Sequence, residues 1–280
     1  MLRQLGETRA PRKPADAGGT GIGGRTRENR RRALELLYLL ALKDWKVRYK
    51  SPTLGFLWAL AHPLCQGGVL IVIFSWFFRL PVENYPAFLL AGMFPWAFFS
   101  LSLSAATNSI VDNAPLIKKV YFPRAILPLS AIAANLANFA FSLGILLLLL
   151  LALGVPPAPS LLLLPLVVLL QLLLLAGLGL LTASLNVPYR DVRYLVEMAL
   201  LLWFYATPIF YPPSMVPETL RGIYMMNPMA GLVTMYRDVL FYGRPFDLSR
   251  MTTTLGVILL IGALGLFVFR RHEGDFADLL

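Results

Sequence analysis

The chain has 280 residues, of which 58% are hydrophobic and 14% charged, and its mean hydropathy is +0.67. Soluble domains contain about a quarter charged residues, so the composition excludes a soluble globular protein and predicts an all-α polytopic membrane protein with about six spans. The net charge of +10 is attributed to basic cytoplasmic loops near anionic headgroups rather than to a nucleic-acid-binding surface.

The first 50 residues are expected to remain outside the bilayer. Residues 1–25 are rich in Arg, Pro, Gly and Ala, which predicts a disordered cytoplasmic tail, and no apolar segment of a signal peptide follows its basic start. Residues 26–50 place Leu34, Leu37 and Leu42 on one stripe at helical spacing. They predict an amphipathic helix in the cytoplasmic interface, with a soluble helix docked on a partner as the alternative.

Residues 51–280 are predicted to form one six-span transmembrane domain. The predicted spans are residues 54–78, 85–111, 125–153, 161–185, 194–210 and 251–269. Of the 25 Lys and Arg residues, the predicted outer segments hold only Arg79, Arg221, Arg237, Arg244 and Arg250. Because cationic loops are retained in the cytoplasm, both termini are expected to be cytoplasmic.

The predicted outer segment 211–250 contains two partly apolar stretches that are too short to cross a bilayer. The first begins near Pro217 and must end before Pro228. The second has Asn227 as its N-cap and Gly243 as its C-cap. These stretches predict short re-entrant or interfacial helices between spans five and six, and a plain loop packed on the bundle is the alternative.

Residues that could bind a metal or a nucleotide are scarce. The histidines, His62 and His272, are far apart and Cys65 is the single cysteine, so we expect no metal site and no disulfide. Two glycine-rich nucleotide-binding patterns in residues 19–26 do not follow a strand, as their mechanism requires. The chain itself is therefore expected to bind neither ATP nor another cofactor.

Ionisable residues inside the predicted spans are equally few. No series of Asp, Glu or His crosses the membrane, which argues against a proton- or sodium-driven transporter and against catalytic residues of an intramembrane enzyme. Glu197 is the only carboxylate well inside a span. An intramembrane charge is a functional candidate, but a structural ion pair with Arg193 explains Glu197 equally well.

Aromatic residues gather near the predicted outer ends of the spans. The interfacial aromatic belt explains most of them, although aromatic faces can also hold sugar rings without strong polar binding. The candidates for a substrate path are Trp96, Phe98, Phe99, Trp203 and Tyr205. Helical spacing cannot place all five on one face, so some of them must face lipid.

Five segments, in this order, resemble the membrane subunits of polysaccharide ABC exporters of the type-2 exporter class. They are RYKSPTLGFLWALAHPL (48–64), KKVYFPR (118–124), NVPYRDV (186–192), TPIFYP (207–212) and NPMAGLVTMYR (227–237). His62 departs from the family pattern, in which many members carry Asn, and the long N-terminal tail is not typical.

The resemblance implies a homodimer in the bacterial inner or plasma membrane, with two copies of a separate cytoplasmic ATPase that binds ATP and Mg²⁺. It implies export of a lipid-linked O-antigen, teichoic acid or capsular polymer. The rivals are a type-2 exporter of drugs or lipids, and a membrane-embedded enzyme or scaffold of polymer assembly.

Two inner loops are expected to couple the chain to the ATPase. The candidate residues are Asp112, Leu116, Ile117, Lys118, Lys119, Tyr121, Tyr189, Arg190 and Asp191. Since a six-helix bundle this apolar would close around its own side chains, two copies are expected to enclose the path between them. Spans one, two and five are expected to line that path, and the 217–243 helices to narrow its outer mouth.

Overall fold

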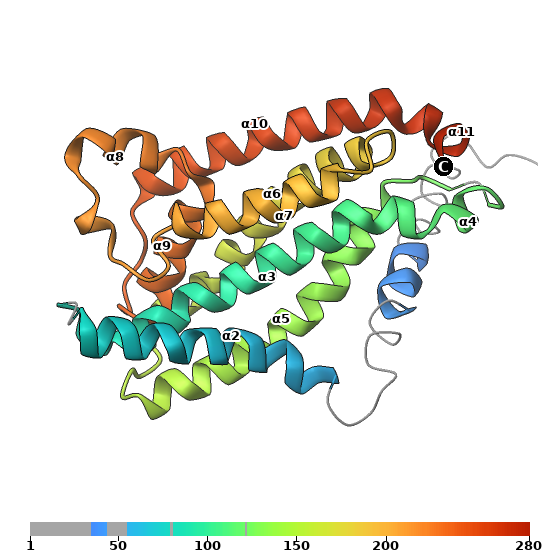
Figure 1. Cartoon of the computed structure of the whole chain (residues 1–280). Helices are drawn as coiled ribbons and strands as arrows, with labels where there is room; N and C mark the ends of the chain where they lie inside the picture. Colours follow the sequence, from blue (N-terminus) through green and yellow to red (C-terminus); the bar gives the residue numbers. More distant parts are fainter. Residues whose placement is uncertain (1–34, 44–54, 79–80, 121) are drawn as a thin grey trace, which may run out of the picture.

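The computed structural model describes residues 35–43, 55–78, 81–120 and 122–280, and all regular secondary structure in these ranges is helical. Figure 1 shows the long helices running side by side along one axis. The predicted all-helical fold is therefore confirmed. The N-terminal tail 1–25 lies outside the described residues. Of the predicted 26–50 helix, only residues 35–43 are described, and these are helical.

Four helices in the described part are long and apolar enough to cross a membrane. They are α3 (Tyr85–Asp112), α5 (Ile126–Ala152), α6 (Leu164–Asn186) with the preceding turn η2 (Pro159–Leu163), and α10 (Leu248–His272) with its extension through η4 (Glu273–Asp275) into α11 (Phe276–Leu279). They match predicted spans two, three, four and six, because an uninterrupted apolar run of this length has few alternatives to a membrane helix.

Helix α3 lies at the centre of the bundle and packs against α2, α5, α6, α7 and α9. Most of its side chains are buried, whereas α5, α6 and α10 expose large apolar residues such as Phe141, Leu169 and Leu260. The first half of α3 is enclosed by its neighbours, whereas its second half is accessible on one side at Leu101, Ser104 and Asn108. The peripheral helices present apolar faces that suit contact with lipid tails.

The first predicted span corresponds to α2 (Gly55–Val72), which continues into the π-helical turn η1 (Ile73–Phe77). Helix α2 packs on α3. At its end Trp76, Phe77 and Phe78 are exposed. This segment agrees with the predicted bounds 54–78 to within one residue at each end.

The fifth predicted span, residues 194–210, is wrong in length. Helix α7 (Val192–Tyr205) has 14 residues, so it is about 21 Å long, compared with about 30 Å for the hydrocarbon core. The helix stops because Pro208 has no N–H and disfavours a helical conformation at Thr207. The Thr207 hydroxyl instead donates to the Trp203 carbonyl at 2.7 Å, and the chain turns away.

The predicted outer segment contains two short helices, α8 (Glu218–Met225) and α9 (Pro228–Leu240), after a short turn η3 (Pro213–Met215). Asn227 is the N-cap of α9, as predicted, and accepts hydrogen bonds from the N–H groups of Met229 and Ala230. The C-cap is Phe241 rather than Gly243, which adopts a left-handed φ of 62° two residues later.

Helix α9 is buried along its whole length and packs against α3, α6 and α10. The alternative, a plain loop packed on the bundle surface, would leave one side of this segment exposed. The α9 helix is instead inserted between the long helices, which agrees with the predicted short inserted helix.

The two ends of the bundle differ in charge. Loops 113–125 and 187–191 and residues 270–280 lie at one end, here called the basic end, together with helix 35–43 and α4 (Ala114–Ile117). Its described cations are Lys43, Lys118, Lys119, Arg124, Arg190, Arg193, Arg270 and Arg271. Loops 81–84, 153–158, 206–227 and 241–247 form the opposite end, on the left of Figure 1 with α8 and α9.

Candidate functional site

A buried arginine joins α9 to α3 and to the segment that follows α7. Arg237 is 1% exposed, and its Nε donates to the Phe88 carbonyl at 3.1 Å. Its two terminal nitrogens donate to the carbonyl oxygens of Pro208 and Ile209. The guanidinium carbon also lies 3.5 Å from the centroid of the Phe88 ring. These contacts compensate the charge for its loss of water.

The absence of a side chain at Gly92 makes room for this guanidinium. A Cβ atom at that position would lie 2.8 Å from Arg237 Nη2 and 3.3 Å from Val233 Cγ1. Sequence reasoning counted Arg237 only as an outer charge. The available signal was a single cation within the mostly apolar stretch 228–240.

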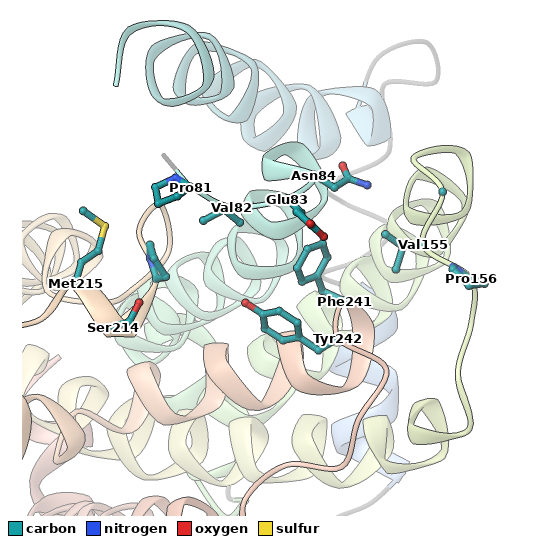
Figure 2. Close-up of a pocket in the computed structure, with 12 residues that line it drawn as sticks. Pro81, Val82, Glu83, Asn84, Val155, Pro156, Ser214, Met215, Phe241 and Tyr242 are labelled. Carbon is teal, nitrogen blue, oxygen red and sulfur yellow. The ribbon is translucent and has the colours of Figure 1, made fainter. Parts of the chain in front are cut away.

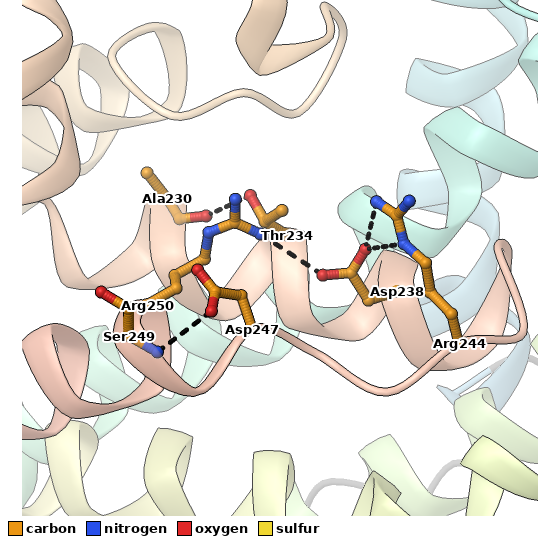
Figure 3. Close-up of polar contacts among 7 residues, drawn as sticks. All are labelled: Ala230, Thr234, Asp238, Arg244, Asp247, Ser249 and Arg250. Atoms are coloured by element: carbon orange, nitrogen blue, oxygen red, sulfur yellow. Dashed lines mark hydrogen bonds and ion pairs between the residues drawn. The ribbon is translucent and has the colours of Figure 1, made fainter.

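The next residue, Asp238, makes two ion pairs at the end of α9 (Figure 3). This carboxylate is 2% exposed and accepts from Arg244 Nε at 2.9 Å and from Arg250 Nη1 at 3.3 Å. Arg250 belongs to the first turn of α10, whose N-cap is Asp247. Asp238 therefore fixes the α9–α10 connection from both sides.

A buried glutamine links three helices near their middle. Gln171 of α6 donates from Nε2 to the Pro95 carbonyl of α3 at 2.8 Å and accepts from the Tyr236 hydroxyl of α9 at 2.7 Å. All three residues are buried. Such a bridge satisfies polar groups that would otherwise lie unpaired in an apolar interior. Gln171 was not singled out from the sequence, although an amide among leucines was a usable signal.

Asn227 connects the end of α7 to the start of α9. Besides capping α9, its Oδ1 accepts from Trp203 Nε1 at 2.8 Å, and its Nδ2 donates to the Ala206 carbonyl at 3.0 Å. Tyr224 of α8 donates to the Tyr211 hydroxyl at 3.4 Å, and burial raises the pKa of Tyr224, which keeps it a donor. The short helices are thus tied to the segment after α7.

Three of the five residues predicted to line an aromatic path are buried inside the subunit. Trp96, Phe98 and Phe99 are at most 8% exposed because α3 is the central helix of the subunit. Phe98 stacks on Phe139 at a centroid distance of 4.6 Å, so it is a core residue. Trp203 is partly buried, and only Tyr205, at 59%, is well exposed. These three side chains therefore cannot face a path at the subunit surface, although the second half of α3 has an accessible side that includes Leu101.

One face of α7 is exposed along the whole helix. It carries Tyr194, Leu195, Glu197, Met198, Leu201, Leu202 and Tyr205. Arg193 donates from Nη2 to the Tyr194 hydroxyl at 2.7 Å and stacks on that ring, so its partner is the tyrosine rather than Glu197. Among the described residues, Arg193 is thus paired with Tyr194 and the proposed structural ion pair with Glu197 is not seen, so Glu197 stays a functional candidate.

The predicted coupling residues that the structure describes belong to the basic end but differ in exposure. Lys118, Lys119, Tyr189, Arg190, Asp191 and Asp112 are exposed. Leu116 is partly buried, and Ile117 is buried in a small apolar cluster with Leu40 and Phe122. Ile117 therefore faces its own subunit, and Tyr121 lies outside the described residues.

A cleft of about 730 Å³ lies at the opposite end (Figure 2). Glu83, Phe241 and Tyr242 face it, together with residues of the 153–158 and 212–215 segments. In the described residues no group of three or more His, Cys, Asp or Glu side chains could hold a metal ion. The chemistry available here is a single carboxylate beside aromatic rings.

Residues 35–241 match the family model of the ABC-2 type transporter. The O-antigen export system permease protein RfbA of Myxococcus xanthus is 36% identical over 242 residues, covering 85% of this chain and 93% of the relative. The protein of the same name from Klebsiella pneumoniae is 33% identical over 248 residues, 88% and 95% of the two chains. The polysialic acid transport protein KpsM of Escherichia coli is 22% identical over 241 residues, 84% and 92% of the two chains.

These matches span most of this chain and nearly the full length of each relative, and they include the inner loops and the α8–α9 segment. They confirm the resemblance drawn from the five sequence segments. The chain is a multi-pass membrane protein that belongs to the ABC-2 type transporter family.

Proposed function

We propose that this chain is the membrane-spanning subunit of an ATP-driven exporter that moves a lipid-linked polysaccharide from the cytoplasm across the bacterial inner membrane. The observation that carries the proposal is its similarity, over 85% of its length, to a permease named for O-antigen export. Another relative is named for the transport of polysialic acid, which, like O-antigen, is a polysaccharide.

The two inner loops of the basic end, residues 112–120 and 187–191, are the proposed docking surface for two copies of a separate ATPase, which would bind ATP and Mg²⁺. Its loops expose Lys118 and Lys119 on one side and Tyr189, Arg190 and Asp191 on the other. Because cationic loops are retained in the cytoplasm, the charge supports a cytoplasmic position for this end and for both termini.

The exposed face of α7 is the proposed homodimer interface and path wall, together with the end of α2. Helix α7 packs on α3 and α6, and its other side is exposed in the part of the chain that the structure describes. A carboxylate such as Glu197 is costly against lipid tails, so a hydrated surface between two copies suits it better. In this arrangement α2 with η1, and α7 with residues 206–212, complete the six crossings.

Reconstitution tests this function directly. The chain and its partner ATPase are placed in lipid vesicles with a lipid-linked O-antigen, and protection of the polysaccharide from an external glycosidase is followed after adding ATP. We expect protection that requires ATP and a hydrolysis-competent ATPase. ATP-dependent movement of a simple phospholipid or drug, without polysaccharide transfer, would favour the rival class of exporter.

A further inference from the structure

The end of α10 contacts the loop that is proposed to couple the chain to its ATPase. The backbone N–H of Arg124 donates to Glu273 Oε1 at 3.1 Å. The Arg124 side chain donates from Nη1 to the carbonyl of Glu273 and, at 3.3 Å, to that of Gly274. The guanidinium of Arg124 also lies over the ring of Phe276, 5.9 Å from its centroid.

Phe276 anchors this contact in the apolar cluster at the basic end. Its side chain is fully buried and meets the ring of Phe269 edge-on, with centroids 5.5 Å apart. Ile117 and Phe122, from the inner loop, belong to the same cluster. Residues 273–276 thus pack against the inner loop through this cluster.

The contact joins α5 and α10, two helices whose main neighbours differ. Helix α10 packs mainly on α6, whereas α5, which begins at Ile126, packs mainly on α3. The hydrogen bonds of Lys118, Lys119 and Val120 are local, to Ala114 and Leu116. Arg124 instead reaches a segment 149 residues away in the chain. The loop therefore receives part of its orientation from the end of α10.

We infer that residues 273–276 act as a latch that positions the inner loop 112–124, with Arg124 and Glu273 as its positioning residues. This inference rests on the proposed coupling role of that loop. In the latched state the buried side of the loop is held by Phe276 and Arg124, and Lys118 and Lys119 remain free to face the ATPase. Movement of the loop by the ATPase would then be transmitted to the ends of both α5 and α10.

The test compares Glu273→Ala with Glu273→Gln and Asp278→Ala in the full complex with its ATPase. Glu273→Ala removes the acceptor for the Arg124 N–H, whereas Glu273→Gln keeps an amide oxygen at that place. Asp278 is an exposed carboxylate just beyond this segment and serves as the matched control. Hydrogen exchange of residues 114–127 and export per ATP hydrolysed are measured in parallel.

For Glu273→Ala we expect exchange in the loop to become about fivefold to tenfold faster and export per ATP to fall severalfold. Glu273→Gln and Asp278→Ala should stay near the unmodified protein. Arg124→Ala, which removes the guanidinium contacts, should reproduce the defect by an independent change.

Two outcomes would overturn the latch, and they are distinguishable. Unchanged exchange in both Glu273→Ala and Arg124→Ala would mean that these contacts do not position the loop, and the proposed export function would stand. Faster exchange with normal export per ATP would instead show that loop position does not govern coupling, so the coupling role of the loop would fall with the latch.

Discussion

The guanidinium of Arg237 lies against the ring of Phe88 while its nitrogens reach carbonyl oxygens on two separate segments. Main-chain carbonyls carry no formal charge, so this buried cation is held by dipoles and by the face of an aromatic ring rather than by a carboxylate. The result is a rigid joint between α9, α3 and the residues after α7. It fixes α9 at the end of the bundle opposite the basic end.

Replacing Arg237 by Met should lower the free energy of unfolding by about 3–5 kcal/mol, because several buried carbonyls lose their donors while the side-chain volume is nearly kept. Arg237→Lys should recover only part of this loss, since an ammonium group cannot reproduce the planar fork. Thermal unfolding in detergent measures the effect. Arg270→Met, an exposed arginine of α10, is the control. An equal small shift in both Met variants would contradict a structural role for Arg237.

A second prediction concerns the close approach of α6 and α10. A Cβ at Gly265 would clash with the carbonyl group of Gly177, lying 2.9 Å from its carbon. Since backbone atoms cannot move aside as a flexible side chain can, Gly265→Ala should force the helices apart and destabilise the protein by about 1–3 kcal/mol. Gly256→Ala on the same helix meets open space and should be neutral or slightly stabilising. Similar melting temperatures for the two variants would rule out the tight crossing.

The sequence predicted well those features that depend on neighbouring residues in the chain. The long apolar runs became α3, α5, α6 and α10, and Asn227 caps α9 because Asn and Pro suit the start of a helix. The shortened α7 was also locally encoded, by Thr207 and Pro208, but the apolar run after Trp203 obscured that signal.

Features decided by tertiary packing were not predictable in this way. Trp96, Phe98 and Phe99 have the composition of a path or an interfacial belt, yet they are buried because α3 is surrounded by other helices. The partners of Arg237 are main-chain carbonyls, which every residue possesses, so the sequence carries no mark of them. The Arg124–Glu273 contact joins residues 149 positions apart in the chain, and it likewise depends on how the helices pack.

Charge reversal tests the proposed docking surface. Lys118→Glu combined with Lys119→Glu should weaken binding of the ATPase about tenfold, because two exposed cations would be replaced by anions at the contact. The control is Arg270→Glu with Arg271→Glu, which makes the same change in charge at the same end of the bundle. ATPase retained on the immobilised permease is measured over a range of salt concentrations. Equal loss of binding in both double variants would indicate a general effect of charge rather than a docking site.

Tyr205 and Phe99 separate the two roles that aromatic residues can have here. Tyr205 is 59% exposed at the end of the open face of α7, whereas Phe99 is fully buried on α3. Tyr205→Ala should therefore slow polysaccharide export severalfold with little change in melting temperature, because it removes a surface contact for sugar rings.

Phe99→Ala should instead create a cavity and destabilise the subunit by about 3–5 kcal/mol, so that export falls only in proportion to the folded protein that remains. Export rates normalised to folded protein, measured beside thermal unfolding, distinguish the two variants. Normal export by Tyr205→Ala would remove the last well-exposed member of the predicted aromatic path and leave that residue as an interfacial anchor. A conservative Tyr205→Phe variant retains the ring, and normal export by Tyr205→Phe beside slow export by Tyr205→Ala would assign the effect to the aromatic face rather than to the hydroxyl.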